Sequence, residues 1–252
     1  MVSAARLCGY SVDIDSRSRG GTVVSTLNSV DLDVASGRVT ALVGESGCGK
    51  SLVALALCGL LPPGSHTTGT LEIAGHAVQT EADWRRLRGH GIGLIPQSPA
   101  TSFTPVRTLG SQLAEIARTL ESAHSVPELL DRVALPSSAA QLFPHELSGG
   151  MAQRAAIAAA LAGSPDLVIA DEPTSALDPA LAEQVWALLS GIAADGRAVL
   201  VVTHDLTSMM RSGTCGSIAV MKAGATVLQA TPAEVLAHED DYIGALFDGA
   251  TV

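Results

Sequence analysis

The sequence predicts an α/β fold in which buried strands end beside polar residues at one edge of a sheet. Three apolar runs rich in β-branched residues indicate these strands, at 39–43, 166–172 and 198–203. The first run leads into a glycine-rich stretch, the second ends in two acids, and the third ends in His204. Ligands of α/β sheets bind beyond the carboxyl ends of the strands, so we expect the functional groups to converge there.

The loop after the first run predicts a phosphate-binding site. Gly44 to Ser51 reads G-E-S-G-C-G-K-S, which fits the pattern G-x-x-x-x-G-K-[ST] at every fixed position. Residues 51–57 continue as a helix that Pro62 and Pro63 must stop. The alternative is a glycine-rich turn that contains lysine and serine by chance, and it is disfavoured because strand, loop and helix all occur in the required order.

This loop is expected to bind ATP and Mg²⁺. Its glycines let successive amides converge on phosphate oxygens at the positive end of the helix. Lys50 would neutralise the β and γ phosphates, and the Ser51 hydroxyl would ligate Mg²⁺. The ATP-binding residues predicted here are Gly44, Glu45, Ser46, Gly47, Cys48, Gly49, Lys50, Ser51 and Leu52.

Two adjacent carboxylates and a histidine complete the predicted site. Asp171 could hold Mg²⁺ through water, while Glu172 could take a proton from the water that attacks the γ phosphate. A strand that ends in a solvated acidic turn is the alternative for this pair, and a structural role is the alternative for His204. The three strand ends together nevertheless form a coherent site for one ATP.

Composition excludes several classes of protein. The net charge of −10 argues against nucleic acid as a partner, because such binding depends on neutralising phosphates. The first twenty residues lack the apolar core of a signal peptide, and no window is long and apolar enough for a membrane span, so we expect a cytoplasmic chain. The four cysteines form no C-x-x-C pair and the histidines form no H-x-x-x-H pair, so we expect no disulfide framework and no bound transition metal.

Five motifs, in order, resemble those of the ATPase subunit of an ATP-binding cassette (ABC) transporter, and the resemblance covers nearly the whole chain. The phosphate loop comes first, and Gln97 in "LIPQSP" is similar to the glutamine loop. Residues 147–151 resemble the signature motif, and 167–172 the strand that carries the magnesium site. Residues 175–178 with His204 are similar to the aspartate loop and the switch histidine.

The resemblance implies roles for residues outside the phosphate loop. Ser148, Gly149 and Gly150 precede an alanine-rich helical stretch and offer a second set of free amides. In the family, the signature of one subunit caps the ATP held by another, so ATP would close a head-to-tail dimer and hydrolysis would reopen it. A surface helix whose glycines ease a turn is the alternative. The implied magnesium ligands are Ser51, Gln97 and Asp171, and Gln97 is also an implied ATP-binding residue. The implied catalytic residues are Glu172 and His204, and Asp178 belongs to the aspartate loop.

The resemblance also implies how the chain is divided. A single ABC ATPase domain would span 1–252, with a P-loop NTPase core, an antiparallel β subdomain and an inserted α-helical subdomain. We expect prolines to interrupt the helices of the inserted subdomain, residues 15–22 to form a hairpin tip, residues 218–228 to form a second hairpin, and a capping box at Thr231 to open the last helix. The expected segments are 1–96 and 166–230 for the core, 97–165 for the helical subdomain and 231–252 for a C-terminal helical tail.

Residues 98–112 and 146–154 are similar to the branch of the family that imports oligopeptides, dipeptides and nickel or metal chelates. Phe103 and Thr104 depart from that branch's common "TSLNP", and the compact length is more like its metal-chelate members. The implied partners are two transmembrane permease subunits, a second ABC ATPase subunit, with a heterodimer favoured over a homodimer, and an extracytoplasmic substrate-binding protein. The chain would then lie at the cytoplasmic face of the membrane, peripherally.

Two aromatic residues leave open questions. Ile14 stands where the family usually stacks an aromatic on adenine, so adenine is expected on aliphatic groups, with Tyr10 in the core. Phe103 either anchors a permease segment or packs within the helical subdomain.

A soluble cassette ATPase of DNA repair or translation and a module that binds ATP without hydrolysis are the competing functions. The short spacing between Ser51 and Ser148 argues against the soluble ATPase, because it leaves no room for a long insertion. The presence of Glu172 and His204 argues against a module that only binds ATP.

Overall fold

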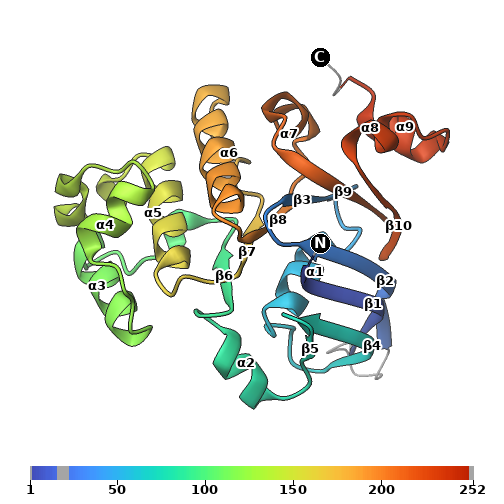
Figure 1. Ribbon diagram of the computed structural model, residues 1–252, viewed down its shortest axis with the longest axis horizontal. Helices are drawn as coiled ribbons and strands as arrows, with labels where there is room; N and C mark the ends of the chain where they lie inside the picture. Colours follow the sequence, from blue (N-terminus) through green and yellow to red (C-terminus); the bar gives the residue numbers. More distant parts are fainter. Residues whose placement is uncertain (1, 16–22, 250–252) are drawn as a thin grey trace.

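The computed structural model describes residues 2–15 and 23–249, which form two sheets flanked by helices (Figure 1). The larger sheet holds strands from distant parts of the chain, and its order is β10-β9-β3-β8-β7-β6. Its members are β10 (Ala225–Ala230), β9 (Cys215–Lys222), β3 (Val39–Gly44), β8 (Ala198–Val202), β7 (Leu167–Asp171) and β6 (Ile92–Ile95). The α/β fold expected from the sequence is confirmed.

The centre of this sheet is covered on both faces, which explains its continuous apolar strands. Strands β6, β7, β8, β3 and β9 run parallel, and every residue of β3 and β8 is buried. Val43 packs in one apolar cluster with Trp186 of α6 (Pro179–Ala194), while Leu42 packs in the other with Val53 of α1 (Lys50–Leu57). Parallel strands place their carboxyl ends at one edge, so the loops after β3, β7 and β8 meet.

The smaller sheet is antiparallel and has the order β2-β1-β4-β5, as expected for the first segment. Its strands are β1 (Ser3–Asp15), β2 (Val23–Ala35), β4 (Ser65–Ile73) and β5 (His76–Ala77). Tyr10 is buried in the core below this sheet, which confirms its expected place. The predicted hairpin tip lies outside the described residues, apart from its first residue, Asp15, which ends β1.

One helix in the first segment was not predicted, and another is not ended by the prolines that were expected to stop it. Helix α2 (Glu81–Leu87) begins at a capping box formed by Thr80 and Asp83. Helix α1 covers the expected residues 51–57, but Pro62 and Pro63 do not end it, because it already stops at Leu57. Gly59 there takes a φ of 63°, and a Cβ at this glycine would lie 2.2 Å from the ring of Trp84 in α2.

Gln229 joins the two sheets, because its side-chain amide binds the backbone of Asp33 in β2 from its place in β10. The Gln229 Oε1 accepts from Asp33 N at 2.9 Å, and its Nε2 donates to Asp33 O at 2.6 Å. We expect Gln229→Ala to lower the free energy of unfolding by about 1–2 kcal/mol, because both backbone groups lose their partner. Urea unfolding would measure this change, with Val227→Ala as the control at an exposed position of the same strand. Equal values for the two variants would contradict the prediction.

The segment between β6 and β7 is helical, and Figure 1 shows α3, α4 and α5 gathered at one side of the molecule, away from the smaller sheet. Of the five prolines expected to interrupt these helices, Pro99, Pro127 and Pro144 stand in the first turn of a helix and Pro136 immediately precedes one, which corrects the expectation for these four. Pro105 does interrupt the segment, in a turn between η1 and α3. The elements are η1 (Pro99–Thr101), α3 (Leu109–Thr119), α4 (Val126–Arg132), η2 (Ser137–Gln141), η3 (Pro144–Glu146) and α5 (Gly149–Leu161). The subdomain boundaries at 97 and 165 stay a prediction.

Phe103 and Val106 lie close together in this segment but differ in exposure. Phe103 is 6% exposed and packs in the same cluster as Leu109 and Leu113 of α3. Of its two expected roles, the structure therefore favours packing within the helical segment. Val106, for which the sequence predicts no role, is 79% exposed.

The chain after β8 contains helix α7 (Leu206–Ser212), the hairpin of β9 and β10, and two short helices. The predicted hairpin and the capping box between Thr231 and Glu234 are confirmed. The box does not open the last helix, however: α8 (Pro232–Leu236) is followed by α9 (Asp241–Phe247), which begins at its own cap, Asp240. None of the helices in the described residues is long and apolar enough to cross a membrane.

Candidate active site

The loop between β3 and α1 requires glycine at two positions. Gly44 has a φ of 149°, and a Cβ there would lie 2.3 Å from the carbonyl oxygen of Met221. Gly49 has a φ of 103°, and a Cβ there would lie 2.6 Å from Leu27 Cδ2. Both backbones are in the region that side chains rarely adopt. The loop therefore passes tightly between β2 and β9 before it turns into α1.

Lys50 is held against this loop. Its side chain is only 7% exposed, and its Nζ donates to the carbonyl oxygens of Gly44 at 2.8 Å and Glu45 at 2.9 Å. Its third donor lies 4.0 Å from Cys48 Sγ. Because a thiol sulfur is a weak acceptor, a phosphate oxygen in the adjoining cavity could replace it. This cavity has a volume of about 410 Å³ and is lined by Gly44, Glu45, Ser46, Lys50, Glu172, His204, Leu206 and Leu246.

The loop and the end of β7 together offer oxygen ligands for a cation. Ser51 Oγ donates to Asp171 Oδ1 at 3.2 Å. Burial raises the pKa of the Asp171 carboxyl above its usual value, and the bond from Ser51 opposes this change. Gln97 is exposed two residues beyond β6, which pairs with β7, so it lies at the same edge of the sheet. Hydroxyl, amide and carboxylate oxygens suit Mg²⁺, so the residues present fit this ion.

Glu172 and His204 are in direct contact, which the sequence did not reveal. Glu172 is 8% exposed, and its Oε1 lies 2.7 Å from Nδ1 of His204. Its φ is 50°, and its backbone N–H donates to the carbonyl oxygen of Val202 in β8. A left-handed backbone at a residue other than glycine costs about 1–3 kcal/mol. This backbone conformation is held by the neighbouring strand.

The signature residues lie on a separate element, at the start of α5. Ser148 caps the helix by accepting from Met151 N at 3.3 Å, and the helix begins at Gly149. Gly149 and Gly150 therefore lie inside the first turn and not, as was expected from the sequence, before the helix. Ser148 and Gly149 are exposed, but Gly150 is buried, and a Cβ there would lie 3.0 Å from Leu181 of α6.

Asp178 caps α6 beside the start of α5. Its Oδ1 accepts from the backbone N–H groups of Ala180 and Leu181, both at 3.0 Å. A Cβ at Gly149 would lie 3.7 Å from Leu177, so the aspartate loop and the signature of one chain are neighbours. The Asp178 carboxylate is thus already hydrogen-bonded to the first turn of α6.

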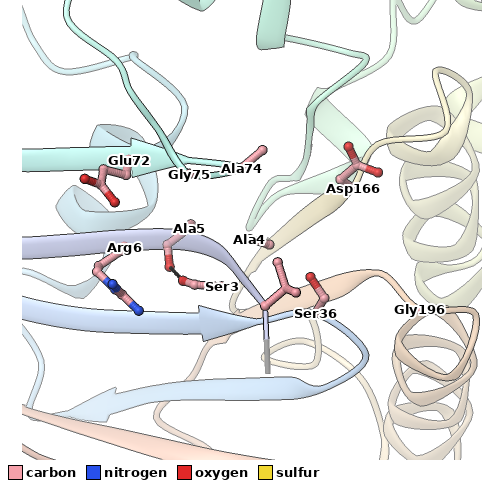
Figure 2. Close-up of a pocket in the computed structure, with 11 residues that line it drawn as sticks. Ser3, Ala4, Ala5, Arg6, Ser36, Glu72, Ala74, Gly75, Asp166 and Gly196 are labelled. Carbon is pink, nitrogen blue, oxygen red and sulfur yellow. Dashed lines mark hydrogen bonds between the residues drawn. The ribbon is translucent and has the colours of Figure 1, made fainter.

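A second cavity, of about 470 Å³, opens at the opposite edge of the larger sheet (Figure 2). Asp166 and Gly196 precede β7 and β8, so this cavity lies at the amino ends of the parallel strands. Its charged side chains are Arg6, Glu72 and Asp166, and Arg6 is paired with Asp33. The cavity beside Lys50 fits a phosphate ligand better, because it combines loop amides, a buried cation and the carboxyl ends of the strands.

No group of three or more His, Cys, Asp or Glu side chains in the described residues is arranged to hold a metal ion by itself. Cys58 is buried and Cys215 is partly buried, and burial raises the pKa of each thiol to about 12. The oxygen ligands beside the phosphate loop therefore form the candidate cation site that the structure supports.

Comparisons with known proteins agree with this geometry. The family model described as ABC transporter matches residues 27–175. The probable peptide ABC transporter ATP-binding protein y4tR of Sinorhizobium fredii is 41% identical over 231 residues, which are 86% of this chain and 68% of that protein. The probable D,D-dipeptide transport ATP-binding protein DdpD of Escherichia coli is 38% identical over 228 residues, covering 85% of this chain and 69% of that protein. The chain thus spans about two thirds of the length of these two relatives.

A solved structure shares the fold and was determined with products of ATP hydrolysis. It is the dimeric post-hydrolysis state of the ATP-binding cassette MJ0796 bound to ADP and Pi. It matches with a TM-score of 0.73 and 27% identity, covering 90% of this chain and 98% of that chain.

Proposed function

Because the chain belongs to the ABC transporter family, we propose that it is the ATP-hydrolysing subunit of an importer for peptides. The observation that carries this proposal is the buried Glu172, which faces the same cavity as Lys50 and is held by His204. A base beside a phosphate-binding loop is the arrangement that hydrolysis needs, whereas a protein that only binds ATP needs no such base. A soluble cassette ATPase is disfavoured, because the relatives are named as transport proteins.

In the proposed mechanism, the loop amides and Lys50 hold the β and γ phosphates, with Lys50 fixed by its two carbonyl partners. Ser51, Asp171 and Gln97 would hold Mg²⁺, which would supply positive charge beside the phosphate oxygens. Glu172 takes a proton from the attacking water at a carboxylate oxygen. His204 orients that carboxylate through Nδ1 and leaves Nε2 free to contact the phosphate or the water.

Adenine is proposed to pack on aliphatic side chains of the smaller sheet. Ile14 of β1 pairs with Val24 of β2, and Val24 is exposed. Thr26, two residues further along β2, lies against Gly49, so Val24 lies about 7 Å along the strand from the phosphate loop. This distance is within reach of the adenine end of a nucleotide whose phosphates bind the loop.

The composite dimer is also a proposal. Ser148 and Gly149 are exposed, and they lie on an element separate from the cavity beside Lys50. They are therefore free to contact the γ phosphate held by a second subunit, while Asp178 stays near that interface. A related second ATPase chain is favoured over a second copy, as in the branch that the sequence resembles.

The proposed assembly has the ATPase at the cytoplasmic face of the membrane. Two permease subunits and an extracytoplasmic substrate-binding protein complete it. Peptides are favoured as cargo because both relatives are named for peptide or dipeptide transport. Nickel or metal chelates are the alternative cargo. Copurification with the permeases, followed by ATP-driven uptake of labelled peptide into vesicles, tests the function. Vesicles that take up a nickel chelate but no peptide would establish the alternative.

Val106 is proposed to contact the permease, because it is an apolar side chain exposed in the segment that follows Gln97. We expect Val106→Ser to reduce copurification of the permeases several-fold while the isolated subunit keeps its melting temperature and basal hydrolysis. Val227→Ser provides the control, since this valine is exposed on the distant strand β10. Equal copurification of the two variants would contradict the prediction.

Phe103→Ala tests whether Phe103 packs within the helical segment or contacts the permease. Because Phe103 is buried among the helices, its truncation should cost about 3–5 kcal/mol of folding free energy. Any loss of permease binding should then accompany a lower melting temperature, whereas Val106→Ser should lose binding alone.

A further inference from the structure

Helix α9 contacts the phosphate loop through a side chain that the proposed mechanism does not use. Tyr242 Oη donates to the carbonyl oxygen of Met221 at 2.9 Å and accepts from the backbone N–H of Glu45 at 3.4 Å. Met221 of β9 pairs with Gly44 of β3, and Glu45 is the next residue of the loop. One hydroxyl thus bridges both sides of the point where the phosphate loop leaves the sheet.

A second residue of the same helix lines the phosphate cavity itself. Leu246 follows Tyr242 by four residues, so the two side chains share one face of α9. Leu246 borders the cavity together with Lys50, Glu172 and His204. With Leu206, it forms the apolar part of the lining of this cavity.

The orientation of α9 is fixed from its other side. Ile243 and Phe247, also four residues apart, are 2% and 4% exposed and belong to the same apolar cluster as Val43 and Trp186. Asp240 caps the helix by accepting from the N–H groups of Tyr242 and Ile243. The ammonium group of Lys222 lies 4.4 Å from the centre of the Tyr242 ring. The helix is therefore anchored while its Tyr242 face meets the loop.

We propose that α9 sets the affinity of the site for ATP: Tyr242 is a positioning residue for the phosphate loop, and Leu246 is a wall of the phosphate cavity. This inference rests on the proposed function, because it concerns the same nucleotide. Tyr242 touches no reacting atom, so it acts by holding the Glu45 amide and the loop in the binding conformation. Its loss should affect binding in the ground state and the transition state equally.

Tyr242→Phe tests the positioning role, because it removes the hydroxyl and keeps the ring over Lys222. We expect the KM for ATP to rise about 3–10-fold, as the loss of a hydrogen bond allows, with kcat within about twofold of the unsubstituted protein. A residue that only stabilises the fold would lower the melting temperature and leave KM unchanged. An unchanged KM overturns the positioning role.

Leu246→Asp tests the wall, with Ala245→Asp as a control of equal charge at the exposed neighbouring position. A carboxylate at 246 would face the phosphates, so we expect the KM for ATP to rise at least about tenfold at low salt and less at high salt. Leu246→Asn has the same shape without the charge and should show a much smaller rise. Equal KM values for Leu246→Asp and Ala245→Asp, or for Leu246→Asn and Leu246→Asp, would contradict the proposal that Leu246 lines the phosphate cavity.

Fluorotyrosine labelling provides a readout in the intact protein, because the chain has two tyrosines, Tyr10 and Tyr242. Tyr242→Phe assigns the two fluorine resonances, and addition of ATP with Mg²⁺ should shift that of Tyr242 more than that of buried Tyr10. A protein that binds ATP without moving the Tyr242 resonance contradicts the inference and leaves the proposed function intact. A protein that binds no ATP contradicts both.

Discussion

Glu172→Gln should reduce steady-state ATP hydrolysis by at least about a hundredfold while ATP binding survives, since removal of a general base costs about that much. The amide has the shape of the carboxylate and can keep a hydrogen bond to His204, which lies 2.7 Å away. It cannot accept the proton of the attacking water. The phosphate loop, Lys50 and the Ser51–Asp171 pair are unchanged.

A nucleotide titration and a phosphate-release assay on the same preparation measure the two effects separately. Lys50→Ala is the contrasting variant, because it removes the buried cation and should weaken ATP binding itself, by about tenfold or more. Hydrolysis within about fivefold of the unsubstituted rate in Glu172→Gln would remove Glu172 from the mechanism, because a general base contributes at least about a hundredfold.

Short-range patterns were sufficient to predict the class of fold and much of the site. The strand, the glycine-rich turn and the helix at residues 39–57, and the later hairpin, follow from spacing alone, and the structure confirms these elements. Phosphate binding by the turn stays a prediction. Membership of the ABC transporter family, expected from the order of five motifs, is also confirmed. The same kind of pattern was present but overlooked at Thr80–Asp83, where a capping box opens α2.

Contacts between distant segments could not be predicted in this way. The hydrogen bond between Tyr242 and Glu45 joins residues 197 positions apart, and no local sequence pattern around either residue predicts it. The burial of Phe103 is likewise decided by how α3 packs, because an isolated aromatic suits a core or an interface equally well. The positive φ of Glu172 depends on its bond to Val202 in the adjacent strand, which is a property of the folded sheet.

Ser148→Arg should leave ATP bound to its own phosphate loop but stop ATP-dependent association of two subunits. Ser148 is exposed and caps α5 through its hydroxyl, so the substitution removes the cap and places a bulky cation where a partner's γ phosphate would lie. Loss of the cap costs about 1 kcal/mol, which is too little to unfold the subunit. The decisive effect is therefore on the interface between subunits.

Association is best measured in the Glu172→Gln background, where bound ATP persists, by light scattering with and without ATP and Mg²⁺. The chain should be mixed with its partner ATPase where one is found, and measured alone otherwise. Ser138→Arg is the control, because Ser138 is an exposed serine of η2 in the same helical segment and receives the same charge. We expect the control to associate on addition of ATP and Ser148→Arg to remain monomeric with ATP bound. Association of the Ser148→Arg protein to the level of the control would show that the signature of this chain does not cap the nucleotide of a second subunit.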